Sequence, residues 1–312
     1  MTGSQTQSYH RAVTSTAGVE SERLPREPLV SVLTPSFNQR SWLVETLRSV
    51  ASQTYPHLEH IVVDGGSTDG SVDVLGAALP AGSWISEPDG GQSEALNKAF
   101  DRSRGEIIGW LNSDDAYFFD DAVESVVDYF RANPGVDVVY GHAALVDETG
   151  MLLHVMWMPP YSKSRLWREN FISQPAVFIR RRVLEDGFLD ESFHYTMDHE
   201  LWLRLATRHS FGRIDEVLAI DRHQAARKSY QWPAQADEEV LRMSERYGIP
   251  QTVPFEARLR RIAYRLRGAP TAFGLRQDRK AFDWSIDSRA RLIVRQLIVK
   301  RRFMATGDMG AT

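Results

Sequence analysis

Two adjacent carboxylates follow a short apolar run and could hold a divalent cation. Residues Ile107–Leu111 are apolar and predict a buried strand, which Asn112 and Ser113 end before Asp114 and Asp115. Ligands of an open α/β sheet bind outside the carboxyl ends of its strands, where these side chains would lie. Neighbouring carboxylates repel each other unless a cation such as Mn²⁺ or Mg²⁺ lies between them. For these residues alone, an acidic turn leading into the next helix is the alternative.

The elements that would position these carboxylates alternate between apolar runs and amphipathic segments. Each run predicts a strand followed by a polar or glycine-bearing loop and a helix, and Asp64 stands at the start of the second loop. Ser41 is expected to cap the first helix, and Ser67 or Thr68 the second. The alternation predicts a parallel, doubly wound sheet with its site along one edge. The runs lie at residues 29–34, 58–63, 83–86 and 107–111.

The second half of the chain has a less regular pattern. A helix is expected at about residues 120–132, and another begins near Asp198. The remaining apolar runs predict strands, two of which would form a hairpin around residues 147–150. These runs lie at residues 136–140, 143–146, 151–156, 174–179 and 211–220.

Composition excludes several classes of protein and site. The chain has 312 residues, 42% hydrophobic and 25% charged, with a net charge of −4, as expected of a soluble α/β enzyme. It contains no cysteine, which excludes disulfides, thiolate metal sites and a cysteine nucleophile. Residues 1–27 are polar and predict a disordered tail rather than a signal peptide or membrane anchor. No stretch approaches the roughly 20 apolar residues of a membrane-spanning helix. These features are compatible with a cytoplasmic location.

Charge is distributed unevenly along the chain. Residues 255–302 contain 12 Arg and 2 Lys against four acidic residues, a net +10, so the remaining residues carry −14. Aliphatic and basic residues are interleaved there, which predicts either an ordinary packed helix or peripheral contact with an anionic membrane. Nothing in this segment matches a nucleic-acid-binding module, so no nucleic acid is expected as a partner.

Four motifs, in this order and at these spacings, resemble those of family 2 glycosyltransferases. They are residues 31–39 (SVLTPSFNQ), 62–70 (VVDGGSTDG), 112–115 (NSDD) and 195–202 (YTMDHELW). The resemblance covers about residues 29–222, and the agreement of four motifs makes it specific. It implies the GT-A fold and the transfer of a sugar, with inversion, from a nucleotide-sugar donor.

Composition, charge and the resemblance together predict three parts of the chain. Residues 1–27 would be the disordered tail, and residues 28–232 a GT-A catalytic domain with a Rossmann-like, doubly wound mixed sheet. Residues 233–312 would form a helical, basic C-terminal extension. Within the catalytic domain, residues 28–115 would bind the nucleotide sugar and residues 116–232 the acceptor.

The motifs also imply roles for residues at the strand ends. Pro35 and its neighbours would line the nucleobase pocket, and Asp64 would hydrogen-bond the base or ribose. Gly65 stands where many relatives have a second acid. The loop at Asp89 and Gln92 opens a helix, where backbone amides could meet phosphate or sugar, or form only a turn and cap. The nucleotide-sugar contacts implied are Thr34, Pro35, Ser36, Asn38, Asp64, Asp89, Gln92 and Asp114.

By the same resemblance, Asp115 would bind Mn²⁺ or Mg²⁺ directly, with His223 as a further ligand. Ser113 stands where the usual Asp-X-Asp motif has its first acid. Arg222 and His223, with Lys228 after them, resemble a flexible cover whose cations meet the diphosphate.

Asp198 falls at the position of the family's general base. Inversion by single displacement requires a carboxylate that deprotonates the acceptor hydroxyl. Glu200, on the same segment, is the reserve candidate, and the alternative role for Asp198 is a helix N-cap. Gln174 could reach the acceptor or be structural.

Three functions are considered for this chain. The first is a metal-assisted transferase that takes a sugar from a UDP-sugar, the common donor class, to a glycan or lipid-linked acceptor at the inner face of the membrane, in the synthesis of a cell-surface polysaccharide or glycolipid. A sugar-phosphate nucleotidyltransferase would carry a glycine-rich loop with Arg and Lys after the first strand, and residues 35–39 are not such a loop. A catalytically inactive nucleotide-sugar-binding scaffold would lack Asp114, Asp115 or Asp198, and all three are present.

Overall fold

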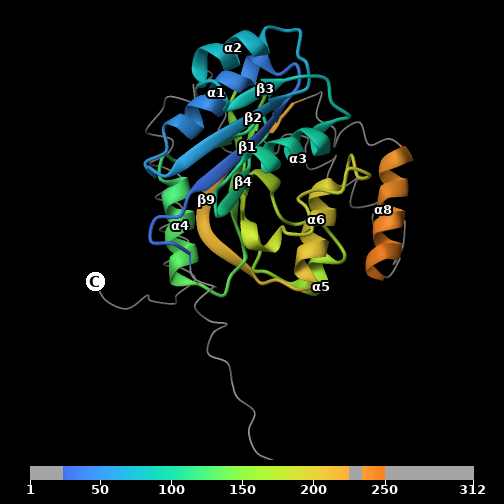
Figure 1. Cartoon of the computed structure of the whole chain (residues 1–312). Helices are drawn as coiled ribbons and strands as arrows, with labels where there is room; N and C mark the ends of the chain where they lie inside the picture. The colour runs from blue at the N-terminus through green and yellow to red at the C-terminus, as the bar shows by residue number, and fades with distance from the viewer. Residues whose placement is uncertain (1–23, 225–233, 250–312) are drawn as a thin grey trace, which may run out of the picture.

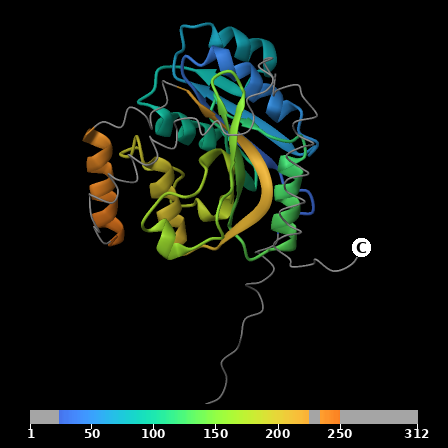
Figure 2. The same ribbon diagram turned by 180° about the vertical axis from the view of Figure 1, so that it is seen from behind.

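The computed structural model describes residues 24–224 and 234–249, which form a nine-stranded mixed sheet covered by helices on both faces (Figures 1 and 2). The strand order is β3-β2-β1-β4-β8-β6-β9-β5, and β7 pairs with β6 outside this series. The strands are β1 (Val30–Ser36), β2 (Leu58–Asp64), β3 (Trp84–Ser86), β4 (Ile107–Trp110), β5 (Ala116–Tyr117), β6 (Val138–Asp147), β7 (Leu152–Met156), β8 (Val177–Arg180) and β9 (Phe211–His223). The helices are α1 (Arg40–Ala51), α2 (Ser71–Ala78), α3 (Gln92–Arg102), α4 (Ala122–Ala132), α5 (Lys163–Leu166), α6 (Met197–Ala206) and α8 (Ala234–Tyr247), with 3₁₀ turns at Gln174–Ala176 and Arg181–Val183.

The first four strands are parallel and end at one edge of the sheet. β1 lies between β2 and β4, and β3 pairs with β2. Ser36 is beside Asp64, and Asp64 is beside Ser86, so the last residues of three neighbouring strands are level. The parallel arrangement predicted for this half of the chain is confirmed. It brings the loops after these strands to the edge where ligands of such sheets bind.

Successive side chains of a strand point to opposite faces of the sheet. Helices cover both faces of this parallel half, so both sets of side chains are buried. Val30, Val32 and Val62 pack on the side of α1, α2 and α4. Leu33 and Val63 pack on the side of α3 and α6. Figures 1 and 2 show these two helical layers with the sheet between them. The helices leave the ends of the strands, rather than their faces, for ligands.

The second half of the sheet differs from the sequence-based expectation. The runs at 136–140 and 143–146 form one strand, β6, which continues through Gly141. A Cβ atom at Gly141 would lie 2.6 Å from Leu218 Cγ of β9, so only glycine allows this close approach. The pairing of β6 with β9 shifts register at this point. The glycine therefore marks close strand packing rather than a break between two strands.

Two helices also begin differently from the expectation. α1 starts at Arg40 and α2 at Ser71, and Asp69 caps both, because Oδ2 accepts the Arg40 N–H at 2.9 Å and Oδ1 accepts the Ser71 N–H at 3.0 Å. Although burial would raise it, these hydrogen bonds hold the pKa of Asp69 below its ordinary value. A negative charge at two helix N-termini is favourable. The caps expected at Ser41 and at residues 67–68 are therefore wrong.

Some expectations lie outside the described residues. They concern most of the tail, residues 1–23, together with Lys228 and the basic segment 255–302. Within the two described ranges, no helix combines the length and apolar character needed to cross a membrane. The domain boundary expected after residue 232 stays a prediction, although α8 places Met243 in the same apolar cluster as side chains of α3 and α6.

We expect Gly141→Ala to lower the free energy of unfolding by about 1–3 kcal/mol, because the added methyl group overpacks the contact with Leu218. Urea denaturation of the purified protein measures this change. Gly135→Ala is the matched control, since a Cβ there meets no atom within 4 Å. Equal stabilities for the two variants would contradict this explanation of β6.

Candidate active site

The end of β1 carries three of the implied nucleotide contacts, and Thr34, Pro35 and Ser36 are all buried. Thr34 Oγ1 lies 2.9 Å from His60 Nε2 inside the protein. Burial lowers the pKa of His60 to about 4, so its ring is neutral. Asn38 is exposed on the following loop, where its Oδ1 accepts a backbone N–H from the loop after β2 at 2.9 Å. Of these residues, Asn38 presents its side chain at the accessible edge.

Asp64 is fully buried at the end of β2, and its carboxylate accepts four hydrogen bonds. Oδ2 accepts from the N–H groups of Gly66 at 3.2 Å and Ser67 at 2.8 Å. The hydroxyls of Ser67 and Ser86 donate at 2.5 Å and 2.7 Å. These donors match the roughly four lone-pair positions of a carboxylate. Asp64 therefore fixes the loop after β2 and ties it to β3, and a nucleotide contact by Asp64 would replace one of these bonds.

Asp89 lies directly against Gly65. Its Oδ1 accepts the Gly91 N–H at 2.9 Å, and a Cβ at Gly65 would lie 2.9 Å from its Oδ2. Burial raises the pKa of Asp89, although the Gly91 N–H and the charge of Lys98 oppose the change. The carboxylate of Asp89 thus fills the space that a side chain at position 65 would need.

Asn112 uses its full hydrogen-bonding capacity to join four side chains. Its Oδ1 accepts from Gln92 Nε2 at 2.7 Å and from Trp110 Nε1 at 2.8 Å. Its Nδ2 donates to Gln174 Oε1 at 2.8 Å and to Asp115 Oδ2 at 3.2 Å. Because the Trp110 ring N–H can only donate, it determines which atom of Asn112 is the oxygen. The network fixes Gln92, expected to contact the donor, and Gln174, for which the sequence leaves a structural role or an acceptor contact open, beside the carboxylate pair.

The last residues of β9 and the residue after it hold Asp114 and Asp115. Asp115 is 5% exposed, and its Oδ1 accepts the Arg222 backbone N–H at 3.0 Å. Asp114 is partly exposed, and its Oδ2 accepts from Gln224 Nε2 at 2.6 Å. Each of the two carboxylates therefore has a hydrogen-bond donor from the end of β9 or the residue after it.

Arg222 is a fixed part of β9. Its side chain is 2% exposed, and NH2 lies 2.6 Å from Glu45 Oε2 of α1. It also donates to the carbonyl oxygens of Asp114 and Asp147 at 2.9 Å and 3.3 Å. Arg222 is the buried partner of this pair, whereas Glu45 is 25% exposed, so loss of Glu45 would leave a buried guanidinium without its carboxylate. The interpretation of Arg222 as part of a flexible cover is wrong, because β9 continues to His223 instead of ending near residue 220.

The donor atoms at the end of β4 fit a hard divalent cation that is shared with a substrate. Mg²⁺ and Mn²⁺ favour carboxylate oxygens, and Mg²⁺ commonly takes one or two of them together with substrate phosphates. Asp114 and Asp115 supply such oxygens, and His223, paired with Asp147 of β6, ends the strand that holds them. Nowhere in the described part of the chain do three or more His, Asp or Glu side chains form a group that could hold a metal.

Asp198 lies in the first turn of α6 and is partly exposed. Its Oδ2 accepts from Asn170 Nδ2 at 2.7 Å, and its Oδ1 accepts the His199 N–H at 2.8 Å. Thr196 occupies the N-cap position, so the alternative of Asp198 as N-cap is not supported. Burial raises the pKa of Asp198, against the opposing effects of His199 and of these hydrogen bonds. A carboxylate with a raised pKa and one accessible side is a candidate general base.

Glu200, the reserve candidate, faces the opposite way. It is fully buried, and its Oε1 accepts from Tyr247 OH at 2.5 Å and from Arg246 NH1 at 3.3 Å. Its Oε2 lies 3.6 Å from Arg204 Nε. The Glu200 carboxylate is engaged in contacts that join α6 to α8. The geometry therefore favours Asp198 over Glu200 as the base.

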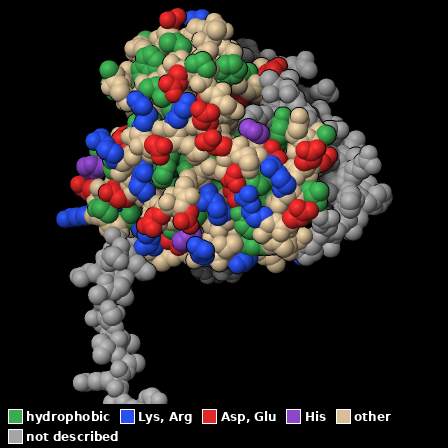
Figure 3. All heavy atoms as spheres, turned by 45° about the vertical axis from the view of Figure 1, so that its right-hand side comes forward, with side chains coloured by type: hydrophobic (Ala, Val, Ile, Leu, Met, Phe, Trp, Pro, Cys, Tyr) green, Lys and Arg blue, Asp and Glu red, His purple; other side chains and the backbone are tan. Residues whose placement is uncertain are grey.

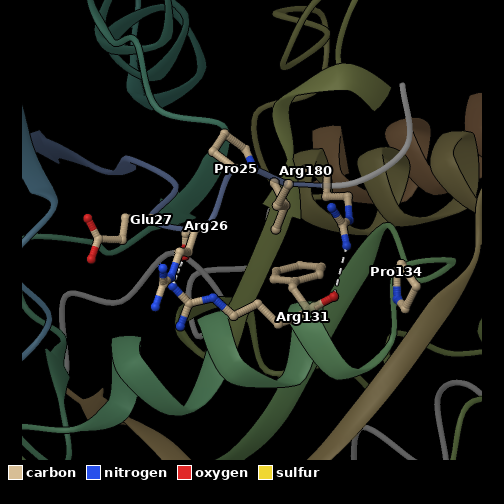
Figure 4. Close-up of a pocket in the computed structure, with 8 residues that line it drawn as sticks. Pro25, Arg26, Glu27, Arg131, Pro134 and Arg180 are labelled. Atoms are coloured by element: carbon tan, nitrogen blue, oxygen red, sulfur yellow. Dashed lines mark hydrogen bonds between the residues drawn. The ribbon is translucent and has the colours of Figure 1, made fainter. Parts of the chain in front are cut away.

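A pocket of about 590 Å³ lies at the other end of β1, away from these loops (Figure 4). Arg26, Arg131 and Arg180 contribute to its lining. Arg180 donates to the carbonyl oxygens of Val136 at 2.7 Å and Phe130 at 3.0 Å, so it serves the C-terminal end of α4. The pocket lies at the amino ends of the parallel strands, which is not where ligands of such sheets bind.

Sequence patterns do not predict the contacts of Asn170, Gln224 and Glu239. Each is a single polar residue far along the chain from its partner. The separation is 28 residues between Asn170 and Asp198, and 110 between Gln224 and Asp114. Only the position of Gln224, directly after Arg222 and His223, offers a signal in the sequence.

Comparison with known sequences agrees with this geometry. The family model described as glycosyl transferase family 2 matches residues 31–188, which include the loops after β1 to β4. Chondroitin synthase from Escherichia coli is 33% identical over 205 residues, or 64% of this chain. That match spans 29% of the synthase, so the chain corresponds to less than a third of this relative.

Solved structures show the same fold. The mannosyltransferase PcManGT from Pyrobaculum calidifontis, in complex with GDP-Man and Mn²⁺, has a TM-score of 0.53 at 21% identity, over 76% of this chain and 70% of its own. TarS residues 1–349 from S. aureus, in complex with UDP, has a TM-score of 0.53 at 17% identity, over 72% and 67%. These likenesses place the mixed sheet in the GT-A type of fold, and the match over residues 31–188 shows that the chain belongs to glycosyl transferase family 2.

Proposed function

We propose that this chain is an inverting, metal-assisted glycosyltransferase that moves a sugar from a nucleoside diphosphate to an acceptor hydroxyl. The observation that carries the proposal is the pair Asp114–Asp115 at the end of β4, inside the segment that matches the family. The candidate base, Asp198, lies beyond that segment, at the start of α6. The reaction needs two functions. The pair Asp114–Asp115 would serve the leaving diphosphate, and Asp198 would accept the proton of the acceptor.

The donor is proposed to bind over the loops after β1, β2 and β3. Asn38 and Asp89 present polar atoms there, and Gln92 joins this region to Asn112. A UDP-sugar is the proposed donor class, and the UDP complex of TarS supports it. PcManGT, with the same fold, carries GDP-Man, so the choice of base rests on direct binding.

Asp115, with Asp114 beside it in the sequence, would hold Mn²⁺ or Mg²⁺ together with diphosphate oxygens. Among the described residues, His223 does not form a three-residue metal group with them. The Mn²⁺ in the PcManGT complex supports this assignment. When bound, such a cation stabilises the negative charge that grows on the leaving diphosphate. The chain's own part is to keep both carboxylates ionised and in place, through the N–H of Arg222 and the amides of Gln224 and Asn112.

Asp198 is proposed to take the proton of the acceptor hydroxyl. The acceptor oxygen forms its bond to the anomeric carbon as the bond from that carbon to the diphosphate oxygen breaks, and the proton moves to the Asp198 carboxylate. A raised pKa makes the ionised carboxylate a stronger base than an ordinary aspartate. The Asn170 amide, 2.7 Å from Oδ2, orients the carboxylate.

The acceptor is proposed to be a glycan or lipid-linked glycan in the synthesis of a cell-surface polysaccharide or glycolipid. The likeness to chondroitin synthase supports a polysaccharide product. An inactive nucleotide-sugar-binding scaffold is the competing function, and the experiments below separate the two.

One nucleoside diphosphate among UDP, GDP, dTDP and CDP should raise the melting temperature only when Mn²⁺ is present. A ligand that binds only the folded state stabilises it by about 2.7 kcal/mol at 100 times its Kd. Asp115→Ala should remove the metal-dependent part of the shift, and Asp101→Ala, at an exposed position on α3, should keep it. No shift with any nucleotide would favour a chain that does not bind donors.

Asp198→Asn should bind the donor normally and transfer sugar roughly 10²–10⁴-fold more slowly, because general base catalysis is lost. Nucleotide melting shifts measure binding, and product formation from labelled donor measures transfer. Asp186→Asn is the control, because that side chain is 84% exposed. Wild-type transfer by Asp198→Asn would exclude Asp198 as the base.

As the pH is lowered, kcat/KM should decline with a midpoint above the ordinary aspartate pKa of about 3.9. Asp198 is ionised above its raised pKa, so activity is retained there and declines as pH falls through that pKa. Asn170→Ala removes a hydrogen bond to the charged form and should move the acid limb to still higher pH. An acid limb unchanged in this variant would contradict the assignment.

A further inference from the structure

α8 lies outside the segment that matches the family, yet it completes the surroundings of Asp198. The matched segment ends at residue 188, before both α6 and α8. Figures 1 and 2 show α8 on the same side of the sheet as α6. The helix buries Ala236, Glu239 and Met243 against the rest of the protein.

Glu239 is the polar residue at the centre of this contact. It is 3% exposed, and its carboxylate accepts backbone N–H groups from His194 at 2.8 Å, Tyr195 at 2.9 Å and Thr196 at 3.0 Å. The Thr196 hydroxyl donates a fourth bond at 3.0 Å. Three successive N–H groups directed at one point form a concave site for an anion. Glu239 supplies that anion from within the chain.

The same helix also contacts Glu200, after Asp198, and two further residues before it. Arg246 and Tyr247 bond Glu200, and Arg246 bonds Asp190 at 2.7 Å. Arg242 and Arg246 also lie over the ring of Phe193, at 4.9 Å and 5.0 Å. Residues 193–196 and Glu200 are therefore both fixed by α8, and Asp198 lies between them.

We propose that Glu239 is a positioning residue for the transfer reaction. By fixing the chain that leads into α6, it sets the place of Asp198, two residues after the last N–H that it binds. This inference rests on the proposed function, because it takes Asp198 to be the base. Misplacement of a reacting group by about 1 Å can cost roughly 10²-fold in rate.

A second glutamate on α8 provides a matched control for Glu239. Figure 3 shows acidic and basic side chains interspersed over the face in view, rather than segregated by sign. Glu238 is the neighbour of Glu239 on α8 and is exposed. Glu238→Gln therefore makes the same change of charge in the same helix without touching residues 194–196.

Glu239→Gln should lower kcat by roughly tenfold to a hundredfold while the KM for donor stays unchanged. Its amide cannot accept all four hydrogen bonds, and its NH₂ group would face backbone donors. The metal-dependent melting shift with nucleotide should equal that of the wild type. Glu238→Gln should match the wild type in every measurement.

Thr196→Val tests the same contact without altering α8. It removes only the hydroxyl bond to Glu239, so its loss of kcat should be smaller than that of Glu239→Gln. The double variant should be slower than Glu239→Gln by less than the effect of Thr196→Val alone, because the two changes act through one contact. Fully additive losses would mean that the two residues act separately.

Hydrogen exchange gives a readout that does not depend on activity. The amides of residues 194–196 should exchange faster in Glu239→Gln than in the wild type. Faster exchange with unchanged kcat would overturn the positioning role of Glu239 and would leave the proposed function unaffected. So would a loss of kcat accompanied by a weaker nucleotide shift, since that indicates general damage to the fold. A wild-type protein that binds nucleotide and transfers no sugar to any acceptor would instead overturn the proposed function.

Discussion

Buried carboxylates at the edge of the sheet and on α8 hold together the parts of the chain that form the site. A carboxylate removed from water is stable in its charged form only when fixed donors replace the lost hydration. Asp64 meets this need through Ser67 of its own loop and Ser86 at the end of the neighbouring strand β3. Asp115 and Glu239 meet it with backbone N–H groups from distant parts of the chain.

This requirement explains why the two halves of the catalytic domain cannot be treated as separate binding units. The carboxylates after β4 belong to the half expected to bind the donor. Their donors come from Arg222 and Gln224 at the end of β9, more than a hundred residues later. Arg222 in turn contacts Glu45 of α1. A structural change at the end of β9 would therefore affect its contacts with Asp114 and Asp115 and its contact with Glu45 of α1.

The sequence predicts those features that depend on local pattern. Apolar runs identify β1 to β4, and their parallel order places Asp64 and Asp115 at one edge. Local pattern fails where a residue acts on a distant partner. Gly141 resembles a strand break until its contact with Leu218 is known. Asp69 caps two helices from a neighbouring loop, and Glu239 has no motif at all, because its role depends on where α8 packs.

The contact between α8 and the chain before α6 has a consequence for biosynthesis. Thr196 and Glu239 are 43 residues apart, and the chain leaves the ribosome from its N-terminus. When α6 has emerged, the three N–H groups before it still lack their carboxylate. Gln224, which bonds Asp114, therefore emerges before Glu239, which bonds residues 194–196. During translation the growing chain passes through a stage in which Arg222 and Gln224 can bond the carboxylates after β4 while Glu239 is not yet available to residues 194–196.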